Sequence, residues 1–301
     1  GWFTGQELTR RLFEMQIVTS LVNVCLNLLF AVGLGWGVEG VALGTALGAY
    51  AGLAVGAWRV RQRARRVAPE GYRLERRRLL DREELAQVVA LNRDIFIRTM
   101  CLTGSFAWIA VIGSMQGDVV LAANGVLLQI LYVSAAGLDG FAMAAEALVG
   151  QALGARDRAA LRRAVVVTTV TALALAALMA LAASLAGGAI IAALTDVEAV
   201  RAVAREHVLW ASLVPLAGVM AYQLDGIFIG AAEGRGMRNA MLLSAALFIP
   251  LGWLLTDWLG NHGLWLALWI WMLARAATLA IRYPALEARA GPSGPAGQVR
   301  H

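Results

Sequence analysis

Long apolar runs separated by short charged segments set the pattern of this chain, and eight of the runs are long enough to cross a membrane. At a helical rise of about 1.5 Å per residue, each run spans roughly the 30 Å hydrocarbon core of a bilayer. The runs are rich in Ala and Leu and lack the period-two alternation of barrel strands, so they predict helices. The predicted spans are Met15–Leu34, Val41–Trp58, Ile95–Met115, Val119–Ala152, Ala164–Ala186, Val208–Ala232, Ala240–Leu259 and Leu264–Ile281.

Composition supports an all-α, polytopic membrane bundle, because hydrophobic residues make up 59% of the chain. All 26 basic residues are Arg, and 22 of them fall on one side of the membrane if Gly1–Glu14 is cytoplasmic. Only Arg201 and Arg205 fall in outer segments. The positive-inside rule therefore predicts that both termini are cytoplasmic. The same rule accounts for the net charge of +6, because the excess Arg residues lie in loops beside the lipid bilayer. No nucleic-acid partner is therefore predicted.

Glycine motifs recur at matching loop positions near the two ends of the chain. The repeated pairs are Gly1-x-x-x-Gly5 with Gly230-x-x-x-Gly234, and Gly37-x-x-Gly40 with Gly260-x-x-Gly263. In this order they indicate that the first two spans copy the last two, as in a two-lobed transporter built from parallel repeats. Four spans corresponding to the third to sixth are then expected ahead of the first.

The predicted organisation has four parts. They are the last two spans of a first lobe (1–58), a basic cytoplasmic linker with an amphipathic helix (59–91), a complete second lobe of six helices (92–283) and a disordered cytoplasmic tail (284–301).

Three carboxylates lie inside the apolar runs. Asp139 and Glu146 are seven residues apart, which places both on nearly the same helix face. Asp225 follows Tyr222 and Gln223 in the sixth span, beyond a kink predicted at Pro215. Acids at membrane depth usually face a bundle interior or a water-filled cavity. We therefore expect all three to face a polar cavity, in a proton or cation site, with helix packing as the alternative role for Asp225.

Other polar residues could line the same cavity. Asp94 and Arg98 are spaced to pair on one helix face, either as a salt bridge that lets Arg98 enter the bilayer or as a gate. Asn27 shares a face with Asn23 in the first span, where interhelical hydrogen bonding is the simpler role. Asn124, in the fourth span, is a further cavity candidate.

Motifs for catalysis or metal binding are not found in the sequence. His207, His262 and His301 have no neighbouring Cys or carboxylate at a known metal-ligand spacing, so no metal site is predicted. Without a phosphate-binding glycine loop, no ATP-driven pump is predicted either. The chain is therefore not expected to be an enzyme.

Four stretches resemble the multidrug and toxic compound extrusion (MATE) transporters, particularly the DinF-like branch. The stretches are NRDIFIRT (92–99), LDGFAMAAEALVGQALGARDRAALRRA (138–164), LTDVEAVRA (194–202) and QLDGIFIGAAEGRGMRNAM (223–241). The resemblance implies a twelve-span fold of two six-helix lobes, of which this chain looks like spans five to twelve. Asp225 matches a family acid well and Asp94 only loosely.

The resemblance further implies a bacterial inner-membrane antiporter. It would export small amphipathic or cationic compounds, with H⁺ or Na⁺ as coupling ion and no other cofactor. The DinF-type proton-carrying Asp would lie in the missing four spans, so these residues alone are not expected to transport. The alternatives are a lipid-linked oligosaccharide flippase of the same superfamily, which would favour a more cationic cavity, and a membrane scaffold without transport activity.

Overall fold

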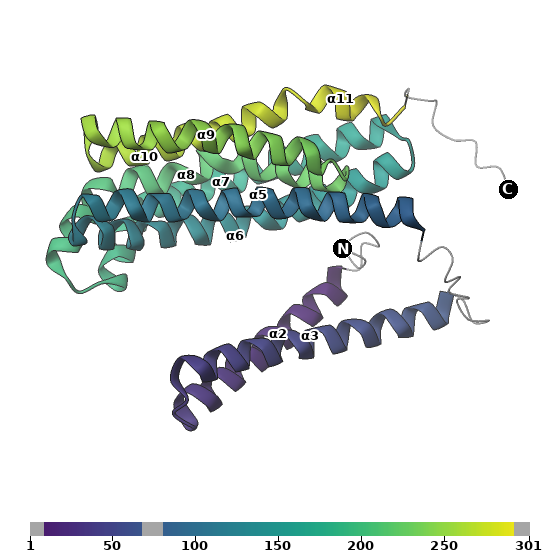
Figure 1. Ribbon diagram of the computed structural model, residues 1–301, viewed down its shortest axis with the longest axis horizontal. Helices are drawn as coiled ribbons and strands as arrows, with labels where there is room; N and C mark the ends of the chain where they lie inside the picture. Colours follow the sequence, from purple (N-terminus) through teal and green to yellow (C-terminus); the bar gives the residue numbers. More distant parts are fainter. Residues whose placement is uncertain (1–8, 68–80, 292–301) are drawn as a thin grey trace. The chain divides into compact units, whose positions relative to one another are not determined.

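The computed structural model describes residues 9–67 and 81–291, and every regular element in these ranges is helical (Figure 1). Eight helices are long and apolar enough to cross a membrane, in the order that the sequence predicts. This result confirms the all-α, multi-span fold class.

The chain divides into two compact units, Gly1–Leu85 and Ala86–His301. The first unit holds two of the membrane-length helices, and the second holds six, with α5 beginning just before the boundary. The elements are α2 (Thr9–Asn27), η1 (Leu28–Gly33), α3 (Gly37–Val67), α5 (Arg82–Met115), α6 (Asp118–Gly154), α7 (Arg158–Leu194), α8 (Glu198–Gly230), α9 (Gly234–Leu259), α10 (Asn261–Ala280) and α11 (Tyr283–Ala288).

A stripe of glycines along α3 allows α2 to approach it closely. A Cβ atom at Gly44 would lie 2.2 Å from Asn27 Oδ1, and one at Gly48 would lie 2.9 Å from Asn23 Cβ. Small residues at intervals of four let two membrane helices bring their backbones together. The stripe comprises Gly40, Gly44, Gly48, Gly52 and Gly56, all buried.

The repeated glycine motifs have the same structural roles in the two units. Gly37 and Gly260 adopt φ angles of 57° and 59°, a left-handed conformation that suits glycine, and each stands where a helix begins. A Cβ at Gly40 would lie 2.9 Å from the Phe30 carbonyl carbon, and one at Gly263 would lie 1.9 Å from the Leu255 carbonyl oxygen. In both cases, the second glycine packs against the backbone of the preceding element. The two turns thus match, and the parallel repeat stays a prediction, because Gly1 and Gly5 lie outside the described residues.

Helix α8 is the most buried of the eight membrane-length helices, with 67% of its most apolar stretch buried. It crosses α6 with very little separation. A Cβ at Gly226 would lie 2.2 Å from the Ala142 carbonyl oxygen, and one at Gly230 would lie 2.4 Å from that of Glu146. By contrast, α5 makes no comparably close helix pair in the described part of the chain and joins its neighbours chiefly through side chains.

Ion pairs link neighbouring elements at the end of the second unit where α7 and α11 begin. Glu287 accepts hydrogen bonds from Arg158 at 2.8 Å and from Arg162, and Arg289 pairs with Glu233 at 2.6 Å. Here the prediction of a disordered tail from residue 284 was wrong for residues 284–290. Pro284 stands in the first turn of α11, where proline favours a helix start, and Leu286 is buried.

The linker predicted over residues 59–91 is helical at both edges. Helix α3 continues to Val67, and α5 begins at Arg82 and runs without interruption into the third span. The predicted amphipathic helix is therefore the first part of α5. The central part of the linker lies outside the described residues.

We expect Gly226→Ala to lower the melting temperature by several degrees. Its Cβ would overlap the α6 backbone at Ala142, which cannot move as a flexible side chain could, and overpacking of this kind costs about 1–3 kcal/mol. The measurement is thermal unfolding of the purified protein in detergent. Gly125→Ala on α6 is the control, because no heavy atom lies within 4 Å of its Cβ position. Equal melting temperatures for the two variants would contradict the tight crossing.

Candidate ion and substrate site

Three charged side chains from three helices form a cluster in the interior of the second unit. Asp225 of α8 accepts a hydrogen bond from Arg275 Nη2 of α10 at 2.7 Å, and Arg98 Nη2 of α5 donates to the same carboxylate oxygen. Asp225 is 6% exposed and Arg275 is 2% exposed. A charge at this depth is tolerated only when it is paired, so each of the three residues depends on the others.

Aromatic and polar neighbours surround the cluster. The Arg275 guanidinium lies 5.3 Å from the ring centre of Trp271 and 5.8 Å from that of Tyr222, distances at which a cation is attracted to the face of a ring. Gln223 is buried and donates to Thr168 Oγ1 at 2.5 Å. The structure thus places Tyr222 beside the cluster and turns Gln223 toward α7.

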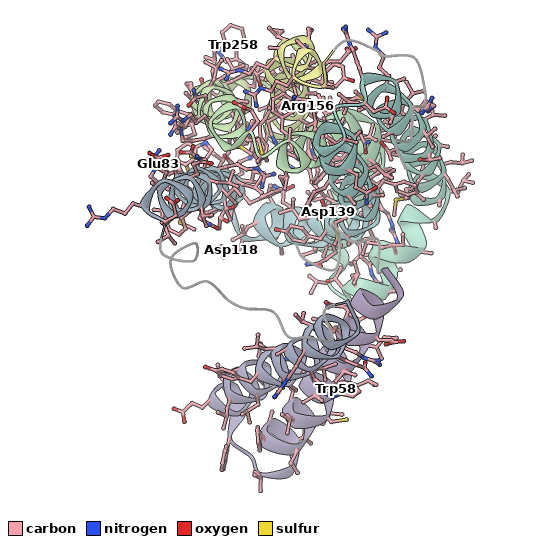
Figure 2. The ribbon with its side chains drawn as sticks, turned by 90° about the vertical axis from the view of Figure 1, so that its right-hand side faces the viewer. Trp58, Glu83, Asp118, Asp139, Arg156 and Trp258 are labelled. Atoms are coloured by element: carbon pink, nitrogen blue, oxygen red, sulfur yellow. The ribbon has the colours of Figure 1, made fainter. Side chains whose placement is uncertain are left out.

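Asp139 lies close to this cluster without being bound in it. The crossing of α6 and α8 brings Ala142 against Gly226, so Asp139, one turn before Ala142, stands near Asp225. Electrostatic interactions link Asp139 with Arg98, Arg275 and Asp225. The Asp139 side chain is exposed at the surface of the second unit (Figure 2). No hydrogen bond or ion pair of Asp139 is found within the described residues.

The three acids therefore occupy different environments. Asp225 is buried and doubly paired, Asp139 is exposed, and Glu146 is half-buried beside the Gly230 contact. The shared face of Asp139 and Glu146 does not bring Glu146 into the ion cluster. A common polar cavity for all three stays a prediction.

Asp94 and Arg98 do not pair with each other, although their spacing permits it. Asp94 is 1% exposed and accepts a hydrogen bond from Arg238 of α9 at 2.6 Å, with Arg93 at 3.2 Å. Arg98 turns instead to Asp225. The pairing predicted from the sequence is wrong, because neighbouring helices bring a different partner to each residue. Together the two ion pairs attach α5 to α8 and α9.

Asn124 and Asn27 lie apart from the cluster. Asn124 and Asn261 exchange side-chain hydrogen bonds of 2.7 and 2.9 Å, and Trp265 donates to Asn124 at 3.0 Å. This arrangement joins α6 to α10 and gives Asn124 a packing role. Asn27, in the first unit, donates to Asn23 at 3.1 Å within its own helix.

Arg275 is the residue that sequence analysis missed. A lone Arg in an apolar run is a weak signal of a site, because its partner on α8 lies 50 residues earlier in the chain. Its presence at membrane depth could nevertheless have identified it, since such a charge requires a counter-ion.

The MatE family model matches residues 95–254, which is more than half of the chain. This chain belongs to the MatE family. It is also 37% identical over 288 residues to DNA damage-inducible protein F of Escherichia coli (strain K12), an alignment that covers 93% of this chain and 60% of that protein. These matches confirm the resemblance to MATE transporters and to their DinF-like branch. They agree with the prediction that the chain is not an enzyme.

Solved structures share the fold at low sequence identity. A mutant form of the MATE transporter VcmN from Vibrio cholerae superposes with a TM-score of 0.83 at 18% identity, covering 95% of this chain and 64% of that one. A MOP superfamily transporter from Pyrococcus furiosus, described as having a binding pocket of reverse polarity, gives a TM-score of 0.77 at 17% identity. That superposition covers 92% of this chain and 63% of the other. The chain thus spans less than two thirds of the relatives it matches.

We expect Asp225→Asn to destabilise the protein, because it leaves two buried arginines without a counter-charge. Breaking a buried pair by removing one partner costs about 3–5 kcal/mol. The double variant Asp225→Asn/Arg275→Gln removes one positive charge as well and should recover part of this loss. Thermal unfolding of both variants and of Arg275→Gln, which retains the Arg98 pair, measures the coupling between the two sites. Strictly additive changes in stability would show that the residues do not act as a unit.

Proposed function

We propose that this chain is part of a secondary transporter that exports amphipathic, often cationic compounds in exchange for H⁺ or Na⁺. Membership of the MatE family and the fold shared with a MATE transporter support the transport function. The observation that carries the coupling is Asp139, an unpaired carboxylate in the middle of a membrane helix, beside two arginines and a second carboxylate.

In this proposal Asp139 is the group that exchanges the coupling ion. Asp225 is less suited to that role, because both arginines bind one of its oxygens and a Na⁺ ion would have to compete with them. With Asp139 ionised, two carboxylates compete for the guanidinium of Arg98. Binding of H⁺ or Na⁺ to Asp139 would remove its attraction and leave Arg98 bound to Asp225.

Such an exchange would act on α5 in particular. This helix is held through side chains more than through close backbone packing, and Arg98–Asp225 and Asp94–Arg238 are its ion pairs with other helices within the described residues. A change in the partner of Arg98 therefore biases the position of α5. A local charge change that shifts a two-state element is a general mechanism of switching.

A flippase for lipid-linked oligosaccharides is the second candidate. One observation favours it: Arg98 and Arg275 outnumber Asp225, and the Nε atoms of both arginines are buried without a hydrogen-bond partner. An anionic group, such as a phosphate, would satisfy these donors. The relative from Pyrococcus furiosus, with its pocket of reverse polarity, is consistent with such a variation on this fold.

We expect Asp139→Asn to abolish transport driven by an ion gradient and to leave the melting temperature close to that of the wild type, since the side chain is exposed and unpaired. The measurement is movement of a cationic dye across vesicles that contain the whole transporter of which this chain is part, with an imposed H⁺ or Na⁺ gradient. Asp118→Asn, at the exposed start of the same helix (Figure 2), is the matched control and should transport normally.

Two other outcomes would count against the proposal. Gradient-dependent dye movement by Asp139→Asn at the wild-type rate would remove this residue from the coupling. Movement of a fluorescent phospholipid-linked anionic probe, with no movement of the cationic dye, would favour the flippase.

A further inference from the structure

Three side chains of types that can bind a metal ion lie together, apart from the ion cluster, where α10 begins beside α8. Glu206 and His207 lie on α8 and His262 is the second residue of α10. One ligand atom from each lies within 4.8 Å of the others, and the two imidazole ring centres are 4.2 Å apart. The sequence predicted no metal site here. That prediction overlooked Glu206 and His207, which are adjacent in the sequence. The third residue of the group, His262, comes from another helix.

His207 offers a nitrogen that nothing else in the described structure uses. Its Nδ1 lies 2.8 Å from the Val203 carbonyl oxygen, so Nδ1 carries the proton and donates to this carbonyl. The Nε2 atom is buried and has no hydrogen-bond partner, in a residue that is only 4% exposed. A buried acceptor without a donor is costly and calls for an explanation. An imidazole held by a backbone carbonyl at one nitrogen, with the other nitrogen free, is also the usual arrangement of a metal ligand.

The other two ligands already have a suitable spacing. His262 Nε2 lies 3.3 Å from Glu206 Oε1. Two ligand atoms at about 2.0–2.1 Å from a tetrahedral zinc ion are separated by roughly 3.3 Å. Glu206 and His262 are both partly exposed, so an ion could reach them from outside.

From this geometry, we propose that Glu206, His207 and His262 bind a divalent transition-metal ion that joins α8 to α10. Two imidazoles and one carboxylate suit zinc, with a fourth position open to water. Magnesium is disfavoured, because it prefers oxygen ligands. Since α8 and α10 also carry Asp225 and Arg275, the ion would tie together the two helices that share the buried pair.

Trp210 provides a test of the coordination. Its Nε1–H donates to His262 Nδ1 at 3.0 Å, which places the proton of the neutral ring on Nε2. Binding of zinc at Nε2 requires that proton to move to Nδ1, where it would meet the Trp210 donor. Trp210 therefore competes with the metal, and Trp210→Phe should strengthen zinc binding several-fold.

The experiment is a calorimetric titration of the purified, untagged protein with Zn²⁺, in a His301→Gln background that removes the remaining histidine. We expect one equivalent to bind and Mg²⁺ not to bind. Glu206→Gln and His262→Gln should each weaken zinc affinity at least tenfold. Both side chains are partly exposed, and circular dichroism checks that the variants fold. Glu198→Gln, at an exposed glutamate in the first turn of α8, is the control and should leave the affinity unchanged.

Three results would overturn the proposal. They are an absence of zinc binding, a zinc affinity that Glu206→Gln and His262→Gln leave unchanged, and an equal loss of affinity in Glu198→Gln. A lower affinity in Trp210→Phe would overturn coordination through His262 Nε2. The titration does not depend on transport, so it tests this site independently of the proposed antiport.

Discussion

The Asp225 carboxylate between two guanidinium groups is the interaction on which the second unit depends. Arg98, Asp225 and Arg275 come from α5, α8 and α10, and none of them is tolerable alone at membrane depth. The pairing therefore constrains three helices at once. Its effect is largest for α5, which lacks the close backbone packing that joins α6 to α8 and α8 to α10. The position of this helix therefore depends on its ion pairs together with core side chains such as Ile109 and Ile112.

Glycine makes the cluster possible, because it controls how near the helices can come. At the crossing of α6 and α8, Gly226 lies against the backbone of Ala142. This contact brings the nearest carboxylate of α6 close to the nearest carboxylate of α8. Asp225 is adjacent to Gly226, and Asp139 is one turn before Ala142. A wider crossing would separate the two acids and weaken any competition between them for an arginine. Helix packing and charge placement are thus linked at one point.

The same helices carry polar contacts of a different kind elsewhere. The Asn124–Asn261 pair joins α6 to α10 through neutral amides that satisfy one another. Glu206, His207 and His262 join α8 to α10, but leave the His207 Nε2 atom unpaired. A satisfied pair is explained by packing, whereas an unsatisfied buried group invites a ligand. The unpaired nitrogen is thus what distinguishes the histidine group from the asparagine pair.

The sequence by itself determined the eight spans, their order and the helical class, because these follow from local hydrophobicity and length. It also located Asp139 and Asp225 as unusual charges, and the glycine motifs that the two units share. Only the tertiary structure decided the partners. Arg98 is one turn from Asp94 yet binds Asp225, and Arg275 and His262 acquire significance only through residues on α8. Periodicity shows which residues share a face of one helix, but pairing between helices depends on their crossing positions, which no local pattern contains.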